Sequence, residues 1–227
     1  MLSYLGVGQI FSRTVLSDRV IIAAELGIEF DQRTKLDVIE DLIAEGLDAV
    51  PAMRTRDVLS MEKLLPLAGI SNKTTVGENE SGERMIYLSD RYGFNNPDSE
   101  WDSKEVEWLL IGDSFTEGVA VQQGEGIAGQ LRVITQESAI NLGKSGNGPL
   151  IELAGITEYA RVIKPKRVLW IYFFNDLQDL KRDKNNPFLM SYMENGFSQN
   201  LISRQKEIDT WLEKYVFAEV LANEKVK

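Results

Sequence analysis

Three short polar clusters, each directly after an apolar run, contain the residues whose types and spacing could do chemistry. In the first cluster, Gly112-Asp113-Ser114, a serine follows the apolar run Trp108–Ile111. A serine hydroxyl there can act as a nucleophile when a neighbouring base removes its proton, and Gly112 lets the backbone turn tightly without a Cβ clash. A serine at this position is also a common helix N-cap. The motif alone therefore predicts either a nucleophile or a cap.

The second cluster, residues 141–149, is dense in glycine and contains a Gly-Lys-Ser sequence, as a phosphate-binding P-loop does. A P-loop needs a further glycine five residues before the glycine of its Gly-Lys pair, and that position is Ser138. The spacing therefore argues against phosphate binding. What remains is either a loop whose bare amides could approach a developing oxyanion or a tight turn between a strand and a helix.

The third cluster places an amide side chain, Asn175, after the apolar run 167–173. An asparagine there can donate a hydrogen bond to an oxyanion or cap the helix that follows. Asp176 and Asp179 are expected to be solvated acids in the first turn of that helix, where its dipole favours negative charge. We assign these two aspartates no catalytic role.

The apolar runs have the length and composition of buried strands. Residues 108–111, 139–142 and 167–173 are separated by helix-length segments at 126–135 and 150–163. Continuous apolar strands that alternate with helices are typical of a parallel sheet with helices on its faces. Ligands bind beyond the carboxyl ends of such strands. The three polar clusters are therefore predicted to meet at one edge of the sheet.

The rest of the chain is predicted to surround this α/β unit. Residues 16–67 have apolar side chains at helical spacing, with Asp31 or Thr34 as the N-cap of the second helix, and residues 201–226 form a further amphipathic helix. The predicted organisation is a helical N-terminal extension at 1–68, a hairpin and linker region at 69–103, and an α/β domain at 104–227.

Taken together, the three clusters resemble the conserved blocks of the SGNH hydrolase family, also called the GDSL family, in both order and kind. Ser114 matches the nucleophile of the first block, Gly146 the oxyanion glycine of the second, and Asn175 the oxyanion asparagine of the third. The stretch 87–97 is similar to the segment before the catalytic block in bacterial members, some of which modify extracellular polysaccharides.

This resemblance implies a fold, an activity and a substrate class. The fold would be the family's flavodoxin-like, three-layer α/β parallel sheet, and the activity that of a serine ester hydrolase or an O-acyltransferase. Ser114 would attack an ester carbonyl while its own backbone amide, Gly146 and Asn175 stabilise the tetrahedral oxyanion. The substrate would be a small-molecule ester or an acylated sugar, and no cofactor is expected.

The family's catalytic base is missing, because the chain contains no histidine, and a serine without an adjacent base is a poor nucleophile. We favour a C-terminally incomplete sheet, with three strands against the five usual for the family, and expect such a chain to be inactive by itself. A second explanation is a binding module that keeps the oxyanion loop, for instance for an acylated sugar. A third is another base, Lys144 or Asp176.

An interpretation outside enzymology is an assembly subunit. The amphipathic segments at both ends of the chain would then form contacts with other subunits. An exposed apolar patch on the 201–226 helix would indicate such a role.

Composition excludes several other classes. A net charge of −10 argues against a nucleic-acid partner, and without cysteine or histidine the usual ligands of transition metals are absent. No apolar run approaches the roughly 20 residues of a membrane span, and the N-terminus lacks the charged region of a signal peptide. The chain as given is expected to be soluble. Its compartment is left open, since a leader or anchor of a longer parent would precede Met1.

Overall fold

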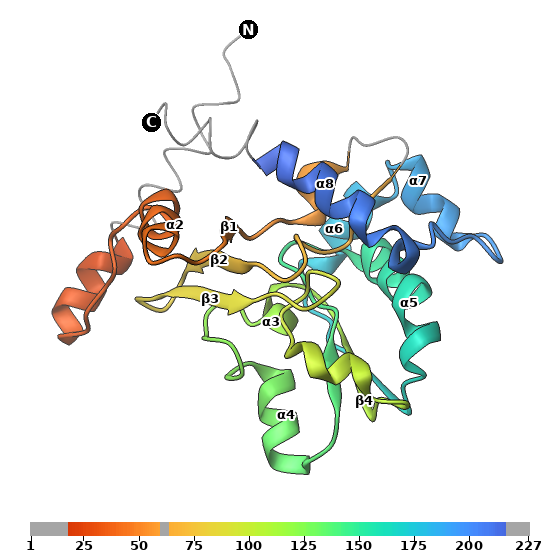
Figure 1. Ribbon diagram of the computed structural model, residues 1–227, viewed down its shortest axis with the longest axis horizontal. Coiled ribbons are helices and arrows are strands. Elements are labelled where there is room, and N and C mark those ends of the chain that lie inside the picture. The colour runs from red at the N-terminus through yellow and green to blue at the C-terminus, as the bar shows by residue number, and fades with distance from the viewer. Residues whose placement is uncertain (1–17, 60–63, 217–227) are drawn as a thin grey trace, which may run out of the picture.

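The larger of two structural units is built on a parallel sheet (Figure 1). The computed structural model describes residues 18–59 and 64–216. Strands β4 (Trp108–Ile111), β5 (Ala139–Asn141) and β6 (Arg167–Trp170) pair in the order β5-β4-β6, and both pairings are parallel. The three predicted strands and their common direction are thus confirmed, although β6 ends earlier than its apolar run.

Helices pack on both faces of the central strand β4, whereas the side chains of the edge strand β6 are exposed. Side chains of a strand alternate between its faces. Leu110 accordingly packs with α4 (Ile127–Thr135), whereas Leu109 and Ile111 lie in the main core with α5 (Pro149–Ile163). The predicted α/β class, with helices on both faces of a parallel sheet, is confirmed in this coarse form.

The remaining helices are short and follow the strands or close the core. They are α3 (Ser114–Glu117), α6 (Asp176–Asp183), α7 (Pro187–Met190) and α8 (Gln205–Tyr215), with 3-10 turns η1 (Thr55–Val58), η2 (Asp98–Asp102), η3 (Ser191–Met193) and η4 (Leu201–Arg204). None of the helices within the described ranges is long and apolar enough to cross a membrane.

Helix α8 turns its apolar side chains inward. Ile208, Leu212 and Val216 are at most 2% exposed and belong to the main core. The apolar patch considered for an assembly role at 201–226 is therefore not present in the described part of that helix. Residues 217–226 lie outside the described residues.

The smaller unit combines α2 (Lys35–Ala44) with strands β1 (Ala49–Pro51), β2 (Thr74–Asn79) and β3 (Arg84–Leu88). The predicted hairpin is confirmed as the antiparallel pair β2-β3. Thr34 caps α2, because its side chain accepts from the backbone N–H of Asp37 and Asp37 accepts from that of Thr34 in return.

One element of this unit differs from the prediction. A wholly helical segment was expected at 16–67, but β1 is a strand that pairs in parallel with β2. The three residues of β1 form a strand because they pair with the edge of β2. Such a long-range contact cannot be predicted from the spacing of apolar residues. Because this pairing crosses position 68, the small sheet spans two of the predicted regions. The domain boundaries themselves stay predictions, and residues 1–17 and 60–63 lie outside the described residues.

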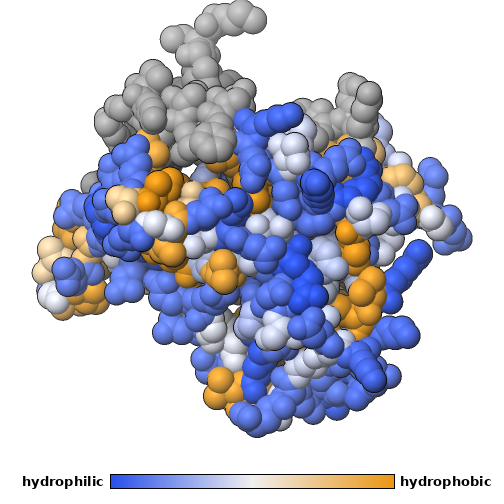
Figure 2. Space-filling model, in the orientation of Figure 1, coloured by the Kyte–Doolittle hydropathy of each residue, from blue (hydrophilic) through white to orange (hydrophobic). Residues whose placement is uncertain are grey.

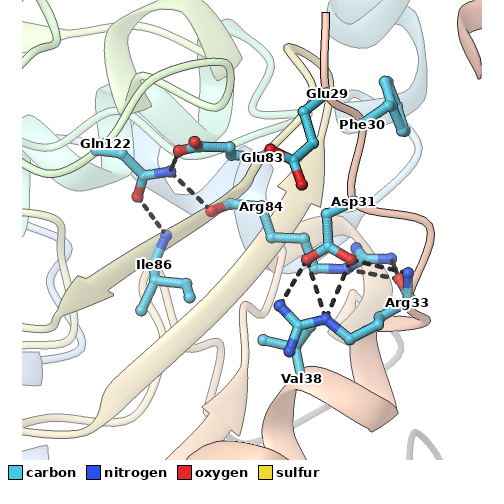
Figure 3. A pocket seen from close by; sticks show the side chains of 10 residues that line it. Glu29, Phe30, Asp31, Arg33, Val38, Glu83, Arg84, Ile86 and Gln122 are labelled. Atoms are coloured by element: carbon cyan, nitrogen blue, oxygen red, sulfur yellow. Dashed lines mark hydrogen bonds and ion pairs between the residues drawn. The ribbon is translucent and has the colours of Figure 1, made fainter. Parts of the chain in front are cut away.

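Two glutamine side chains join the two units. The side-chain oxygen of Gln122 accepts from the backbone N–H of Ile86 at 3.2 Å, and its amide nitrogen donates to the carbonyl of Arg84 at 2.9 Å (Figure 3). Gln123 bonds the N–H and the carbonyl of Leu88 in the same way, at 3.1 and 3.0 Å. The loop after α3 thus satisfies the free edge of β3, as a neighbouring strand would.

The turn from β4 into α3 requires a glycine. A Cβ at Gly112 would lie 2.1 Å from Thr116 Oγ1 and 2.8 Å from the carbonyl oxygen of Ile171. The close approach predicted for Gly112 is therefore confirmed, and it brings the end of β4 directly against the end of β6.

We expect Gly112→Ala to lower the free energy of unfolding by about 1–3 kcal/mol, because the added methyl group overpacks this turn. Gly155→Ala is the matched control. Gly155 lies inside α5, and apart from the backbone of the helix itself and its chain neighbours nothing lies within 4 Å of its Cβ position, so alanine should raise stability by up to about 1 kcal/mol. Urea denaturation measures both, and equal stability of the two variants would contradict the packing described.

Candidate functional site

Ser114 lies at the carboxyl end of β4, as the first residue of α3. The N-cap of that helix is Asp113, whose side chain accepts a hydrogen bond from the backbone N–H of Phe115 at 3.1 Å. Ser114 is half-buried, and its hydroxyl has no hydrogen-bond partner among the residues that the structure describes. The capping role that the sequence left open for Ser114 is thus filled by Asp113, and the serine hydroxyl is available to a ligand.

Asn175 follows β6 and directs its side chain toward the first cluster. Its Nδ2 donates to Asp113 Oδ2 at 3.3 Å and to Asp179 Oδ2 at 3.2 Å, and its side chain makes no capping hydrogen bond to α6. The amide therefore contacts the residue that precedes Ser114. An oxyanion bound here would have to replace one of these carboxylate contacts.

Gly146 lies in the loop after β5, in a conformation that favours glycine. Its φ is +76°, and a Cβ at this position would lie 2.8 Å from Arg56 Cδ. Its carbonyl accepts from Arg182 at 3.0 Å, and Arg182 also pairs with Asp179 at 2.6 Å. Because Asp179 in turn contacts Asn175, side-chain contacts connect all three clusters.

Sequence reasoning missed Arg56 and Arg182. Arg182 stands three residues after Asp179 on α6, a spacing typical of an ordinary surface pair, and nothing in it indicates the contact with the second cluster. Arg56 belongs to η1 of the N-terminal region, and only the tertiary fold brings it to Gly146. Partial burial lowers the pKa of Arg56, as does the nearby charge of Arg54.

A buried ion pair holds the loop that contains Gly146. Lys144 Nζ contacts Glu117 Oε1 and donates to the hydroxyl of Tyr87 at 3.1 Å, and the two charged side chains are 0% and 2% exposed. Glu117 Oε2 also accepts the backbone N–H of Ser145 at 2.6 Å. The pair therefore ties α3, the loop after β5 and strand β3 to one another.

The same contacts occupy the amine that Lys144 would need to offer as a base. Burial by itself would lower the pKa of Lys144, but the charge of Glu117 outweighs burial and, with the hydrogen bonds from Glu117 and Tyr87, raises the pKa above its ordinary value of 10.5. Within the described residues no contact joins Lys144 to Ser114. The structure therefore gives no support to Lys144 as the base.

Asp176 also differs from the expectation. It was expected to be a solvated first-turn acid, but it is fully buried, and its Oδ2 accepts the backbone N–H of Phe173 at 2.7 Å. Burial raises the pKa of this carboxyl. Its side chain holds the turn after β6, and no contact joins it to Ser114 within the described part of the chain, so the structure gives no support to Asp176 as the base.

A further buried acid, Glu152, was missed because it looks like an ordinary acid in the first turn of α5. It is 2% exposed and accepts a hydrogen bond from Trp170 Nε1 at 2.6 Å. Burial, supported by the charges of Asp176 and Asp113, raises the pKa of Glu152 to about 7. No group of three or more acids among the described residues is arranged to hold a metal ion.

The stretch 87–97 holds the end of strand β5 in place through hydrogen bonds. Buried Asp90 accepts from Trp101 Nε1 and from Asn96 Nδ2, both at 2.8 Å, and burial raises the pKa of Asp90 to about 6. Asn96 bonds both the backbone N–H and the carbonyl of Asn141, at 2.8 and 2.9 Å. Asn141 in turn donates to the carbonyl of Thr116 in α3 at 2.6 Å. This network fixes the end of β5 against α3.

Comparisons with known proteins found one distant structural likeness to report. No family model matches the chain, and no curated protein matches it. Among solved structures, AlinE4, described as an SGNH-hydrolase family esterase, is similar at 20% identity with a TM-score of 0.30, over 46% of this chain and 56% of that chain. A likeness at this level decides neither fold family nor activity. The roles of Ser114, Gly146 and Asn175 therefore stay predictions.

We expect Lys144→Met to lower the free energy of unfolding by about 3–5 kcal/mol, because it leaves the Glu117 carboxylate buried without a countercharge. The double variant Glu117→Gln/Lys144→Met carries no buried charge at either position and should lose less than the single variant. Urea denaturation of the three proteins measures this. A single variant as stable as the unchanged protein would contradict the structural role of the pair.

Proposed function

We propose that this chain carries the nucleophile and the oxyanion site of an SGNH-type serine ester hydrolase or O-acyltransferase. The observation that carries the proposal is the convergence of three clusters from three neighbouring parallel strands. The clusters are connected by side-chain contacts through Asp179 and Arg182. Ser114 lies among them, and its hydroxyl has no hydrogen-bond partner within the part of the chain that the structure describes.

The reaction would begin with attack of Ser114 Oγ on the carbonyl carbon of an ester, with loss of the hydroxyl proton to a base. The resulting oxyanion would accept hydrogen bonds from the backbone amides of Ser114 and Gly146 and from the Asn175 side chain. Collapse expels the alcohol and leaves an acyl-serine. Transfer of the acyl group to water makes the protein an esterase, and transfer to a sugar hydroxyl makes it an acyltransferase.

The base would come from polypeptide that pairs with β6. This strand is one of the two outer strands of the parallel sheet, and its residues Val168 and Trp170 are 52% and 46% exposed. A parallel sheet is normally covered on both faces, and an open apolar edge strand is a template for another strand. We infer that such a strand brings the missing histidine, and that the chain by itself is inactive.

Exposed aromatic side chains beside Ser114 and Asn175 support an acylated carbohydrate as the substrate. The rings of Phe115 and Phe173 lie 4.8 Å apart, and those of Phe173 and Phe174 lie 4.6 Å apart. All three are between 39% and 70% exposed. Phe115 follows Ser114 and Phe174 precedes Asn175, so the apolar face of a sugar ring could pack on these rings beside the reacting ester.

A second candidate function, a non-catalytic assembly or carbohydrate-binding module, has its own supporting observation. Exposed apolar side chains gather on the helix at 18–26 and the turn after it, on the side of the molecule next to α2 (Figure 2). Ile21, Leu26 and Ile28 are 56%, 67% and 52% exposed. Such a patch is typical of a contact with another protein.

Exogenous imidazole tests the esterase proposal, because it can replace a missing histidine side chain. We expect the chain with imidazole to hydrolyse p-nitrophenyl acetate several-fold faster than imidazole alone, and the chain without imidazole to show no turnover that depends on Ser114. Ser114→Ala should remove the gain, whereas Ser145→Ala, a serine of the neighbouring loop, should keep it. Equal rates for the unchanged chain and Ser114→Ala at every imidazole concentration would favour a binding or assembly role.

A further inference from the structure

A cavity of about 370 Å³ opens beside Ser114, between α3 and the start of α4. Its volume is at the lower end of the range of about 300–1,000 Å³ that is usual for small-molecule sites. We propose that this cavity binds the acyl group of the substrate, and that this group is short, apolar and uncharged. The inference rests on the proposed function, since it names the substrate class of the same serine.

The side chains of the cavity are those that an acyl chain would contact. Besides Ser114 and two glycines, its wall is formed largely by apolar residues, namely Phe115, Val119, Ala120, Val121 and Ile127. Phe115 is 56% exposed and Ile127 is 38% exposed, so apolar surface is left open to a ligand. Burying a hydrocarbon chain against this surface removes it from water, which favours binding.

The wall is held in place before any ligand arrives. The loop 119–126 is tied to β3 by the contacts of Gln122 (Figure 3) and by those of Gln123 with Leu88. Glu125 Oε2 also accepts the backbone N–H of Gln122 at 3.1 Å. A preformed wall lowers the entropy cost of binding. The small sheet thereby has a functional consequence, because it fixes one side of the cavity next to the nucleophile.

Charge around the cavity selects against anionic acyl groups. Two carboxylates, Glu80 from the turn after β2 and Glu125 from the loop, belong to its lining, and no lysine or arginine is among the described residues that line it. A second carboxylate on the acyl group, as in a dicarboxylic acid ester, would be repelled. An acetyl or slightly longer alkanoyl group meets no such penalty.

Methyl ketones test this inference, because they offer a carbonyl and an alkyl chain but cannot be hydrolysed. Binding of 2-butanone to 2-decanone to the full chain is followed by the amide shifts of Gly118, Val119 and Val121 in ¹H–¹⁵N spectra. We expect affinity to rise with chain length and then level off when the cavity is full. We expect 7-oxooctanoate, a methyl ketone of the same length with a carboxylate at its far end, to bind several-fold more weakly than 2-octanone, and Glu80→Gln/Glu125→Gln to reduce that difference.

Two tryptophan variants locate the binding. Ala120→Trp fills the cavity from an exposed position and should abolish the chain-length dependence, whereas Ala44→Trp, at an exposed alanine at the end of α2, should leave it unchanged. Shifts that survive Ala120→Trp, or the absence of any ketone binding, would overturn the inference. The readout needs no catalysis. Ketone binding without imidazole rescue would therefore sink the proposed function alone, and rescue without ketone binding would sink the acyl cavity alone.

Discussion

A charged lysine inside a protein must keep a countercharge close to it, and in this protein that requirement fixes the candidate site. Lys144 and Glu117 are both buried, and their ion pair joins the loop after β5 to the helix that begins with Ser114. The second oxygen of Glu117 holds the backbone of Ser145, next to Gly146. If either charged group moved away, the other would stay buried without a countercharge. The pair therefore holds the loop and the helix in one relative position.

The Lys144–Glu117 pair lies at the end of the parallel sheet where the three clusters meet. A cluster with polar side chains follows each of β4, β5 and β6, and contacts through Asp179 and Arg182 of α6 connect these clusters. On the outer side, the apolar residues of β6 remain exposed. Two observations bear on the proposed catalytic base. The three clusters gather at one end of the sheet, and the edge strand β6 is exposed.

The sequence was sufficient where local patterns carry the structure. Three apolar runs predicted three parallel strands, and glycine at position 112 predicted the tight turn into α3. Three clusters at carboxyl ends predicted their convergence, which the contacts of Asn175 bear out in part. These inferences depend on periodicity and on backbone sterics, both of which are visible in a single sequence.

Long-range contacts were not predictable in this way. β1 is a strand because β2 offers it an edge, Asp176 is buried because the turn after β6 closes over it, and Arg56 reaches Gly146 from a distant segment. The sequence also left Lys144 open as a base, and only the structure reveals that its amine is buried against Glu117. Each of these features is set by the tertiary surroundings of a side chain and not by its neighbours along the chain.

In the proposed reaction, Ser114, Gly146 and Asn175 surround one oxyanion. The most direct measurement is a crystal structure of the chain with ethylboronic acid, whose trigonal boron becomes tetrahedral when a serine oxygen bonds to it, as the carbon of an attacked ester does. We expect boron bonded to Ser114 Oγ, with one boronate oxygen within hydrogen-bond distance of the Gly146 amide and of Asn175 Nδ2. A boronate on Ser114 whose oxygens point away from both groups, or no adduct at this serine, would contradict it.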